Sequence, residues 1–190
     1  RWDAAAWRTL GQGTARAVDA LAVTPAGDLL IGGGFATAGG VPAARCARWA
    51  PPCRPAVAPF GSGCVGSGGL QQLVALVPPW DGGTYRVRAT GLPATALVFS
   101  VLGFGQLAIP WPALFPEGLA GCNLSVTPDR LDVLATSGGV GEFAVHVARA
   151  PSLVGLTVYH QVVPFELDLA LQPIAVSSTN ALAVTVGGYQ

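Results

Sequence analysis

The stretch Thr84-Tyr85-Arg86-Val87-Arg88 alternates between polar and apolar side chains. A period of two places Arg86 and Arg88 on one face of a β-strand, and Tyr85 and Val87 on the other. The stretch Glu142-Phe143-Ala144-Val145-His146-Val147 repeats this alternation. Both stretches are therefore predicted to be strands that are half buried, with one face in a core and one in water.

Short apolar segments with the same character recur between residues 60 and 190, and Gly and Pro separate them. The chain Thr127-Pro128-Asp129-Arg130 is predicted to be a hairpin turn between two of them. Eight or nine short strands with such turns are typical of a β-sandwich, and we expect one of jelly-roll type. Helix is expected only as a single turn within residues 110–117. The predicted strands are 70–77, 84–89, 97–102, 122–127, 131–135, 142–148, 156–162 and 181–186.

Composition limits the class of protein. Hydrophobic residues make up 51% of the 190 residues and charged residues 11%, and 26 Gly and 16 Pro divide the apolar content into short pieces. No apolar run is long enough for a transmembrane helix. Ten acidic residues balance ten arginines, lysine is absent, and the arginines do not cluster, so nucleic-acid binding is not supported. A surface with so little charge offers little repulsion between copies of the chain.

The first fifty residues carry a repeat signal. Arg1-Trp2 recurs 47 residues later as Arg48-Trp49, and periods in the forties are typical of propeller blades. The turn Thr24-Pro25-Ala26-Gly27-Asp28 is predicted to close a hairpin between residues 17–23 and 29–31. Residues 43–49 are predicted to form the next strand.

Three motifs in this segment carry a family resemblance: Trp7-Arg8-Thr9-Leu10-Gly11, the run from Gly33 to Gly40 with Phe35 between glycine pairs, and Ala47-Arg48-Trp49. With them, residues 1–50 resemble the blade-like repeats of large secreted bacterial proteins. The stretch Phe60 to Gly69 is similar to the start of a C-terminal β-sandwich domain that often follows such repeats. The resemblance implies architecture and secretion, and it implies no chemistry.

These signals predict three parts: a blade-like repeat at 1–50, a linker at 51–59 and a β-sandwich domain at 60–190. The linker is expected because Pro51, Pro52, Pro55 and Pro59 favour an extended connection. The chain lacks methionine and begins at Arg1 without a signal-peptide pattern. We therefore expect a processed piece of a longer secreted precursor, or a fragment of it, in an extracellular or cell-surface setting.

The four cysteines, Cys46, Cys53, Cys64 and Cys122, show no C-x-x-C or histidine spacing. Such a set predicts disulfides in an oxidising compartment. Three pairings exist, and Cys46–Cys53 with Cys64–Cys122 is the simplest. Four buried free thiols are the alternative.

Motifs for catalysis or cofactors are weak. Gly61-Ser62-Gly63-Cys64-Val65-Gly66 matches G-x-G-x-x-G, but no strand and helix flank it, so we interpret it as a glycine-rich loop that holds a disulfide. His146 and His160 lie in predicted strands and are expected to be partly buried and hydrogen-bonded. A Ser-His-Asp triad could arise only from distant segments. We expect no enzyme activity and no cofactor.

Acidic and aromatic residues supply the remaining candidate sites. The pairs Glu166 with Asp168 and Asp129 with Asp132 are candidates for a glycosidase acid pair or a structural calcium, but we expect turn and surface acids and no metal. Trp80 and Trp111, which lie beside prolines, are the candidate contact surface, with packing as the alternative. Asn123-Leu124-Ser125 is a formal glycosylation acceptor.

A single blade leaves two apolar faces and two open edges, which must be covered by neighbouring blades or by another copy. The leading hypothesis is a non-enzymatic extracellular structural subunit that self-assembles into a filament or surface layer through β contacts. The alternative is a surface-anchoring or carbohydrate-binding module of a larger secreted protein. A hydrolase is the third hypothesis, and it depends on a site invisible in the sequence.

Overall fold

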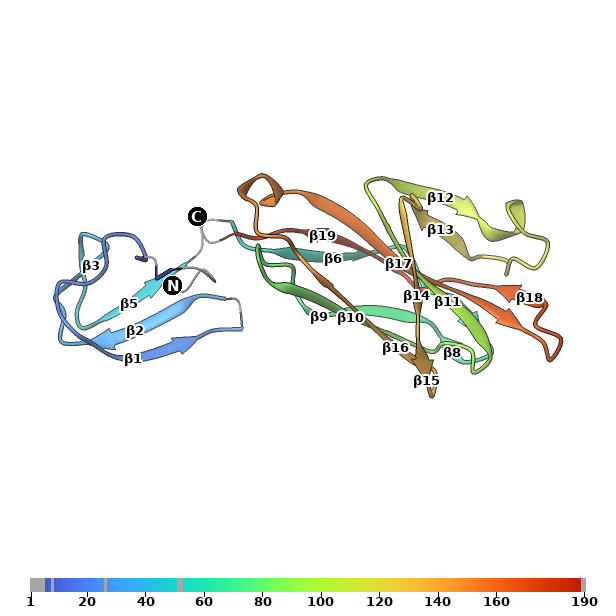
Figure 1. Ribbon diagram of the computed structural model, residues 1–190, viewed down its shortest axis with the longest axis horizontal. Coiled ribbons are helices and arrows are strands. Elements are labelled where there is room, and N and C mark those ends of the chain that lie inside the picture. The colour runs from blue at the N-terminus through green and yellow to red at the C-terminus, as the bar shows by residue number, and fades with distance from the viewer. Residues whose placement is uncertain (1–5, 8, 26, 51–52, 189–190) are drawn as a thin grey trace. The chain divides into compact units, whose positions relative to one another are not determined.

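The computed structural model describes residues 6–7, 9–25, 27–50 and 53–188. Its secondary structure is almost entirely β-strand, and contacts divide the chain into two units, Arg1–Pro52 and Cys53–Gln190 (Figure 1). None of the helices in the described part of the chain has the length and apolar character that a membrane crossing requires. The all-β class expected from the sequence is confirmed.

The N-terminal unit contains a three-stranded antiparallel sheet. Its order is β1 (Val18–Val23), β2 (Leu29–Gly33) and β5 (Cys46–Trp49). The expected turn after Val23 joins β1 to β2, and the Thr24 amide donates to the Asp28 carbonyl at 2.9 Å. A small hairpin of β3 (Thr37–Ala38) and β4 (Val41–Pro42) follows. Phe35, between the motif's glycine pairs, is fully buried in this unit.

Two antiparallel sheets form the C-terminal unit. The four-stranded sheet has the order β15 (Thr136–Ser137), β16 (Val140–His146), β10 (Thr84–Thr90), β9 (Gln72–Val77). The larger sheet has the order β14 (Arg130–Leu134), β11 (Ala96–Gly103), β17 (Thr157–Leu167), β19 (Ala181–Thr185), β6 (Ala56–Phe60), and β18 (Pro173–Val176) also pairs with β17. Separate ribbons are β12 (Gln106–Pro110) with β13 (Asn123–Val126), and β7 (Val65–Gly66) with β8 (Gly69–Leu70). Short 3-10 turns occupy Trp111–Ala113 and Pro151–Leu153.

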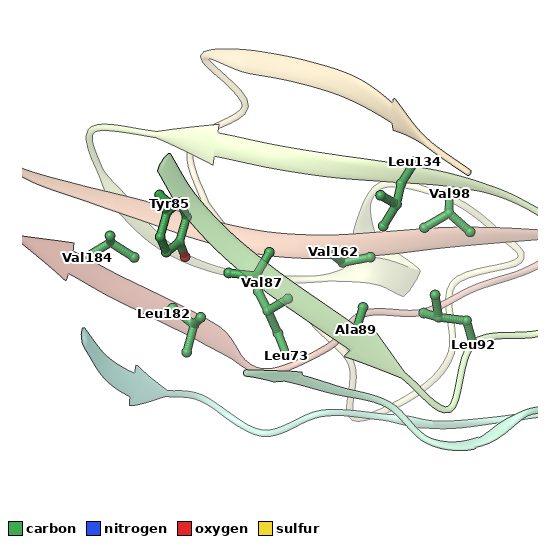
Figure 2. Close-up of a cluster of buried hydrophobic side chains, with 10 residues drawn as sticks. All are labelled: Leu73, Tyr85, Val87, Ala89, Leu92, Val98, Leu134, Val162, Leu182 and Val184. Atoms are coloured by element: carbon green, nitrogen blue, oxygen red, sulfur yellow. The ribbon is translucent and has the colours of Figure 1, made fainter. Parts of the chain in front are cut away.

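The first core lies between the two sheets. Tyr85, Val87 and Ala89 of β10 point into it with side chains of β17 and β19 (Figure 2). On the opposite face of β10, Arg86 and Arg88 bind the carboxylate of Glu142 at 2.9 and 2.7 Å. The alternation predicted for this strand is therefore confirmed.

A second core covers the other face of the larger sheet. Val101 of β11 and Val163 of β17 pack there against the β12–β13 ribbon and Trp111. The disulfide Cys64–Cys122 belongs to this core and ties the chain before β7 to the start of β13. Strand β17 is buried at its centre because the larger sheet has a core on both faces.

Two local expectations need correction. Residues 56–59, expected in the linker, lie in β6, which pairs with β19. Pro59 fits there because β6 is the outermost strand of the sheet, where a missing amide hydrogen is tolerated. Thr127–Arg130 does not close a hairpin, because β13 pairs with β12 whereas β14 pairs with β11.

Candidate functional site

A hollow on the described surface lies in the N-terminal unit, over one face of its sheet. Its volume is about 890 Å³. The floor consists of side chains from all three strands, and the rim comes from the segment around Leu10 and from the β3–β4 hairpin. The floor residues are Val18, Leu21, Leu29, Ile31, Ala47 and Trp49. The site is therefore largely apolar, and its floor is a small three-stranded sheet.

A β-bulge explains why β1 contributes so much apolar surface. The register of β1 against β2 shifts between Val18 and Ala20. With this shift, the aliphatic residues of β1 lie opposite every second residue of β2. The pairs are Val18 with Gly33, Leu21 with Ile31, and Val23 with Leu29. Residues opposite each other in an antiparallel pair share a face. All three aliphatic side chains of β1 therefore lie on the face that carries the hollow, and Leu21 and Val23 are 68% and 71% exposed.

Within the described part of the chain, strand β1 is also an open edge. It ends the order β1-β2-β5, and every residue in it is exposed. Asp19 is its only charged residue. Exposed edges of this kind are templates for pairing with another chain unless charge, proline or a covering element protects them.

Charge at the hollow is internally balanced. Arg48 lies in its lining and forms an ion pair with Asp28 at 2.5 Å, and Asp28 is buried. Arg48, the charged side chain among the described lining residues, is thus neutralised by Asp28. An apolar, uncharged occupant therefore suits this site better than a charged one.

The C-terminal unit buries an unexpected polar network. The Ser100 hydroxyl lies 2.8 Å from Nε2 of His160, and the Tyr85 hydroxyl lies 3.2 Å from Nδ1. Burial lowers the pKa of His160 to about 3 and raises the pKa of Tyr85, while the charge of Asp132 raises the pKa of His160 by a smaller amount. His160 is therefore a neutral imidazole in the folded protein at neutral pH.

This Ser–His pair differs from a catalytic triad in two respects. Ser100 and His160 are both fully buried in the core, where no substrate reaches them. The second ring nitrogen faces the hydroxyl of Tyr85, whereas a triad places a carboxylate there. We interpret the network as a connection between the sheets. Its members come from three separate strands, and for that reason no local motif reveals it.

The cysteines divide into two classes. Cys64 and Cys122 form the disulfide that the simplest pairing contains. Cys46 and Cys53 are free thiols in the structure. Their bridge stays a prediction.

The two tryptophans of the candidate contact surface lie in different environments. Trp111 is only 4% exposed and packs in the second core against Phe115 and Phe165, so it offers almost no surface for contact. Trp80 is half-buried and forms a β-bridge with Gly187. A flat aromatic platform from both indoles is therefore not available.

The acidic candidates make local contacts. Asp129 accepts a hydrogen bond from the Phe104 amide at 2.7 Å, which with a bond from Thr127 lowers its pKa. Asp132 pairs with Arg130 at 2.8 Å. Asp168 accepts bonds from backbone amides in its own turn. Among the described residues, no cluster of three acids, histidines or cysteines has the geometry to hold a metal ion.

The G-x-G-x-x-G segment is explained by close packing. A Cβ at Gly63 would lie 1.7 Å from the Gln71 carbonyl oxygen, and one at Gly66 would lie 2.6 Å from Nε2 of Gln71. Gln71 is fully buried, and its Nε2 donates to the Ser177 hydroxyl. The glycines therefore allow the loop to approach the buried chain at Gln71.

No protein-family model matches this chain, and comparison with curated proteins and with solved structures gives no match.

Proposed function

We propose that this chain is a non-enzymatic extracellular structural subunit that assembles with other copies of itself, as a filament or surface layer, through β contacts. The observation that carries the proposal is the surface of β1, an open edge whose aliphatic side chains lie exposed beside an apolar hollow. Covering that surface would remove several aliphatic side chains from water, at about 25 cal/mol for each Å² of apolar area.

The blade and jelly-roll assignments belong to this proposal. The blade assignment is supported by the antiparallel order β1-β2-β5 of the N-terminal unit, and the jelly-roll assignment is supported by the two packed sheets of the C-terminal unit. The resemblance to secreted blade repeats supports an extracellular setting, and a disulfide within the second core is compatible with it. The zero net charge supports self-association because copies do not repel one another.

Light scattering coupled to size exclusion tests the proposal on two matched variants of the full chain. Leu21→Arg places a charge on the exposed edge and beside the hollow, whereas Leu169→Arg places the same charge on a fully exposed loop residue of the other unit. Leu21→Arg is expected to reduce the mass towards the 19.2 kDa of one chain. Leu169→Arg is expected to keep the wild-type mass. Equal masses for wild type and Leu21→Arg would contradict the role of β1.

A further inference from the structure

We propose that the loop between β17 and β18 inserts its two leucines into the surface of a bilayer of zwitterionic lipids. The loop comprises residues 168–172 and lies at the tip of a hairpin in the C-terminal unit (Figure 1). Leu169 is fully exposed, and Leu171 is 70% exposed. This inference goes beyond the proposed self-assembly and does not depend on it.

The backbone at Leu171 indicates that its side chain acts outside the fold. Its φ angle is 59°, in the left-handed region that glycine adopts freely and that larger side chains rarely adopt. A glycine would remove this strain, and an exposed leucine gains little packing energy in return. The stability of the fold therefore gives no reason for a leucine here, whereas contact with something outside the chain does.

The loop satisfies its own backbone, as an apolar medium requires. The Asp168 carboxylate accepts hydrogen bonds from the amides of Ala170 and Gln172 at 2.8 and 2.9 Å. The Leu171 amide donates to the Asp168 carbonyl at 3.0 Å, and the Asp168 amide donates to the Gln172 carbonyl at 3.0 Å. A lipid interior offers no hydrogen bonds, so a loop that supplies its own can enter the surface of a bilayer at low cost.

Shape and chemistry favour a lipid surface over other occupants. A fully exposed tip protrudes from the protein, and a bilayer can receive such a tip without a pocket of matching shape. Leucine side chains offer a polysaccharide neither hydrogen bonds nor an aromatic face. Ile174 of the same hairpin is also exposed and extends the apolar surface along β18.

The charges around the loop select the class of lipid. Residues 168–176 contain Asp168 and no basic residue. The neighbouring segment adds Glu117, whose carbonyl accepts a hydrogen bond from the Val176 amide at 2.9 Å. Anionic headgroups attract basic side chains and repel acidic ones. Zwitterionic lipids such as phosphatidylcholine are therefore expected to bind better than anionic ones.

Two leucines give weak binding for a single chain. A myristoyl group binds bilayers with a constant of about 10⁴ M⁻¹, and two leucine side chains bury less apolar surface. A partition constant below about 10⁴ M⁻¹ is therefore expected. Full burial of one leucine corresponds to a factor of about ten or more. An assembly that presents several such loops would bind more tightly through multivalency.

Co-sedimentation of the full-length chain with phosphatidylcholine vesicles tests the proposal. Leu169→Ser is expected to lower the partition constant at least about tenfold. Leu171→Gly is expected to lower the partition constant similarly while the Tm stays equal or rises, because the variant relieves the backbone. Leu131→Ser, at an exposed leucine of β14 in the same unit, is the control and is expected to bind as the wild type does.

The outcomes separate this inference from the proposed function. The proposal is wrong if the wild type does not bind phosphatidylcholine vesicles at millimolar lipid, if Leu169→Ser binds as the wild type does, or if phosphatidylserine strengthens binding. A lower mass of Leu169→Ser in lipid-free solution would assign the loop to a contact between copies and would also overturn the proposal. A wild-type chain that binds vesicles but stays monomeric in solution would support the lipid site and contradict the proposed function.

Discussion

The Ser100 hydroxyl lies 2.8 Å from Nε2 of His160, and both side chains are fully buried between the two sheets of the C-terminal unit. Tyr85 completes the network from the opposite sheet. A neutral imidazole has one donor and one acceptor, and hydroxyl groups can serve as either. Both ring nitrogens are therefore satisfied in the neutral imidazole, and burial disfavours the charged form.

Acid should destabilise the protein through His160. Its pKa is about 3 in the folded state and about 6.5 in an unfolded chain. As pH falls below 6.5 the unfolded state binds the proton first, so stability is largest above 6.5 and declines until about pH 3. The slope approaches about 1.4 kcal/mol per pH unit in this window. Urea unfolding between pH 7 and pH 5 measures this slope. Carboxyl groups such as Glu142 contribute little in this range because their pKa lies below it.

His146 provides the control for this pH dependence, because it is an exposed histidine on β16. His146→Gln is expected to keep the wild-type slope, and His160→Gln is expected to lose most of it. A wild-type free energy of unfolding that is flat between pH 7 and pH 5 would show that His160 does not titrate as described.

Reduction of the Cys64–Cys122 disulfide should destabilise the C-terminal unit. The bridge closes a loop with a sequence separation of 58. Loss of this constraint on the unfolded chain corresponds to about 4 kcal/mol. Urea unfolding of the Cys64→Ser/Cys122→Ser double variant measures the effect. Ser62→Ala, at an exposed residue of the same loop as Cys64, is the control and should stay within about 0.5 kcal/mol of the wild type.

Gly63→Ala should destabilise the C-terminal unit, although the change adds only a methyl group. The new Cβ would lie 1.7 Å from the Gln71 carbonyl oxygen, and backbone must move to relieve the contact. A loss of about 3 kcal/mol or more is expected by thermal unfolding. Gly34→Ala, where nothing lies within 4 Å of the new Cβ, should cost less than about 1 kcal/mol. Similar effects at both positions would refute the packing account of the glycine-rich loop.

Phe35→Ala should unfold the N-terminal unit selectively. Phe35 is the only large side chain of this unit among the fully buried ones in the described chain, and truncation of a buried phenylalanine costs about 3–5 kcal/mol. Hydrogen exchange measured by mass spectrometry should show loss of protection in β1, β2 and β5. Peptides from β10 and β17 should keep their protection, and loss of protection in both units would contradict the division of the chain.

Most strands could be predicted from the sequence because their alternation is local. The strand around Tyr85 and the turn after Val23 depend only on neighbours in the chain. Strand β6 was missed because Pro55 and Pro59 suggested a linker, and only the position of β6 at a sheet edge makes Pro59 acceptable. The turn at Thr127 shows a second limit of prediction from the sequence. Turn residues reverse the chain but do not decide which strands pair.

The candidate site was harder to predict from the sequence. It depends on the register in which the strands pair and on contacts between residues far apart in the chain. The aliphatic residues of β1 share one face only because of the bulge between Val18 and Ala20. Trp111 was placed on a surface because prolines flank it, yet the same segment folds into the second core. A sequence signal for the site did exist in β1, which is apolar apart from Asp19.

Sedimentation velocity of the wild-type chain over a wide concentration range is the most direct test of the central claim. The exposed edge and hollow of the N-terminal unit predict that the weight-average mass rises above 19.2 kDa as concentration increases, and that Leu21→Arg suppresses the rise. A constant mass of one chain at every concentration, with β1 protected from hydrogen exchange, would contradict the account.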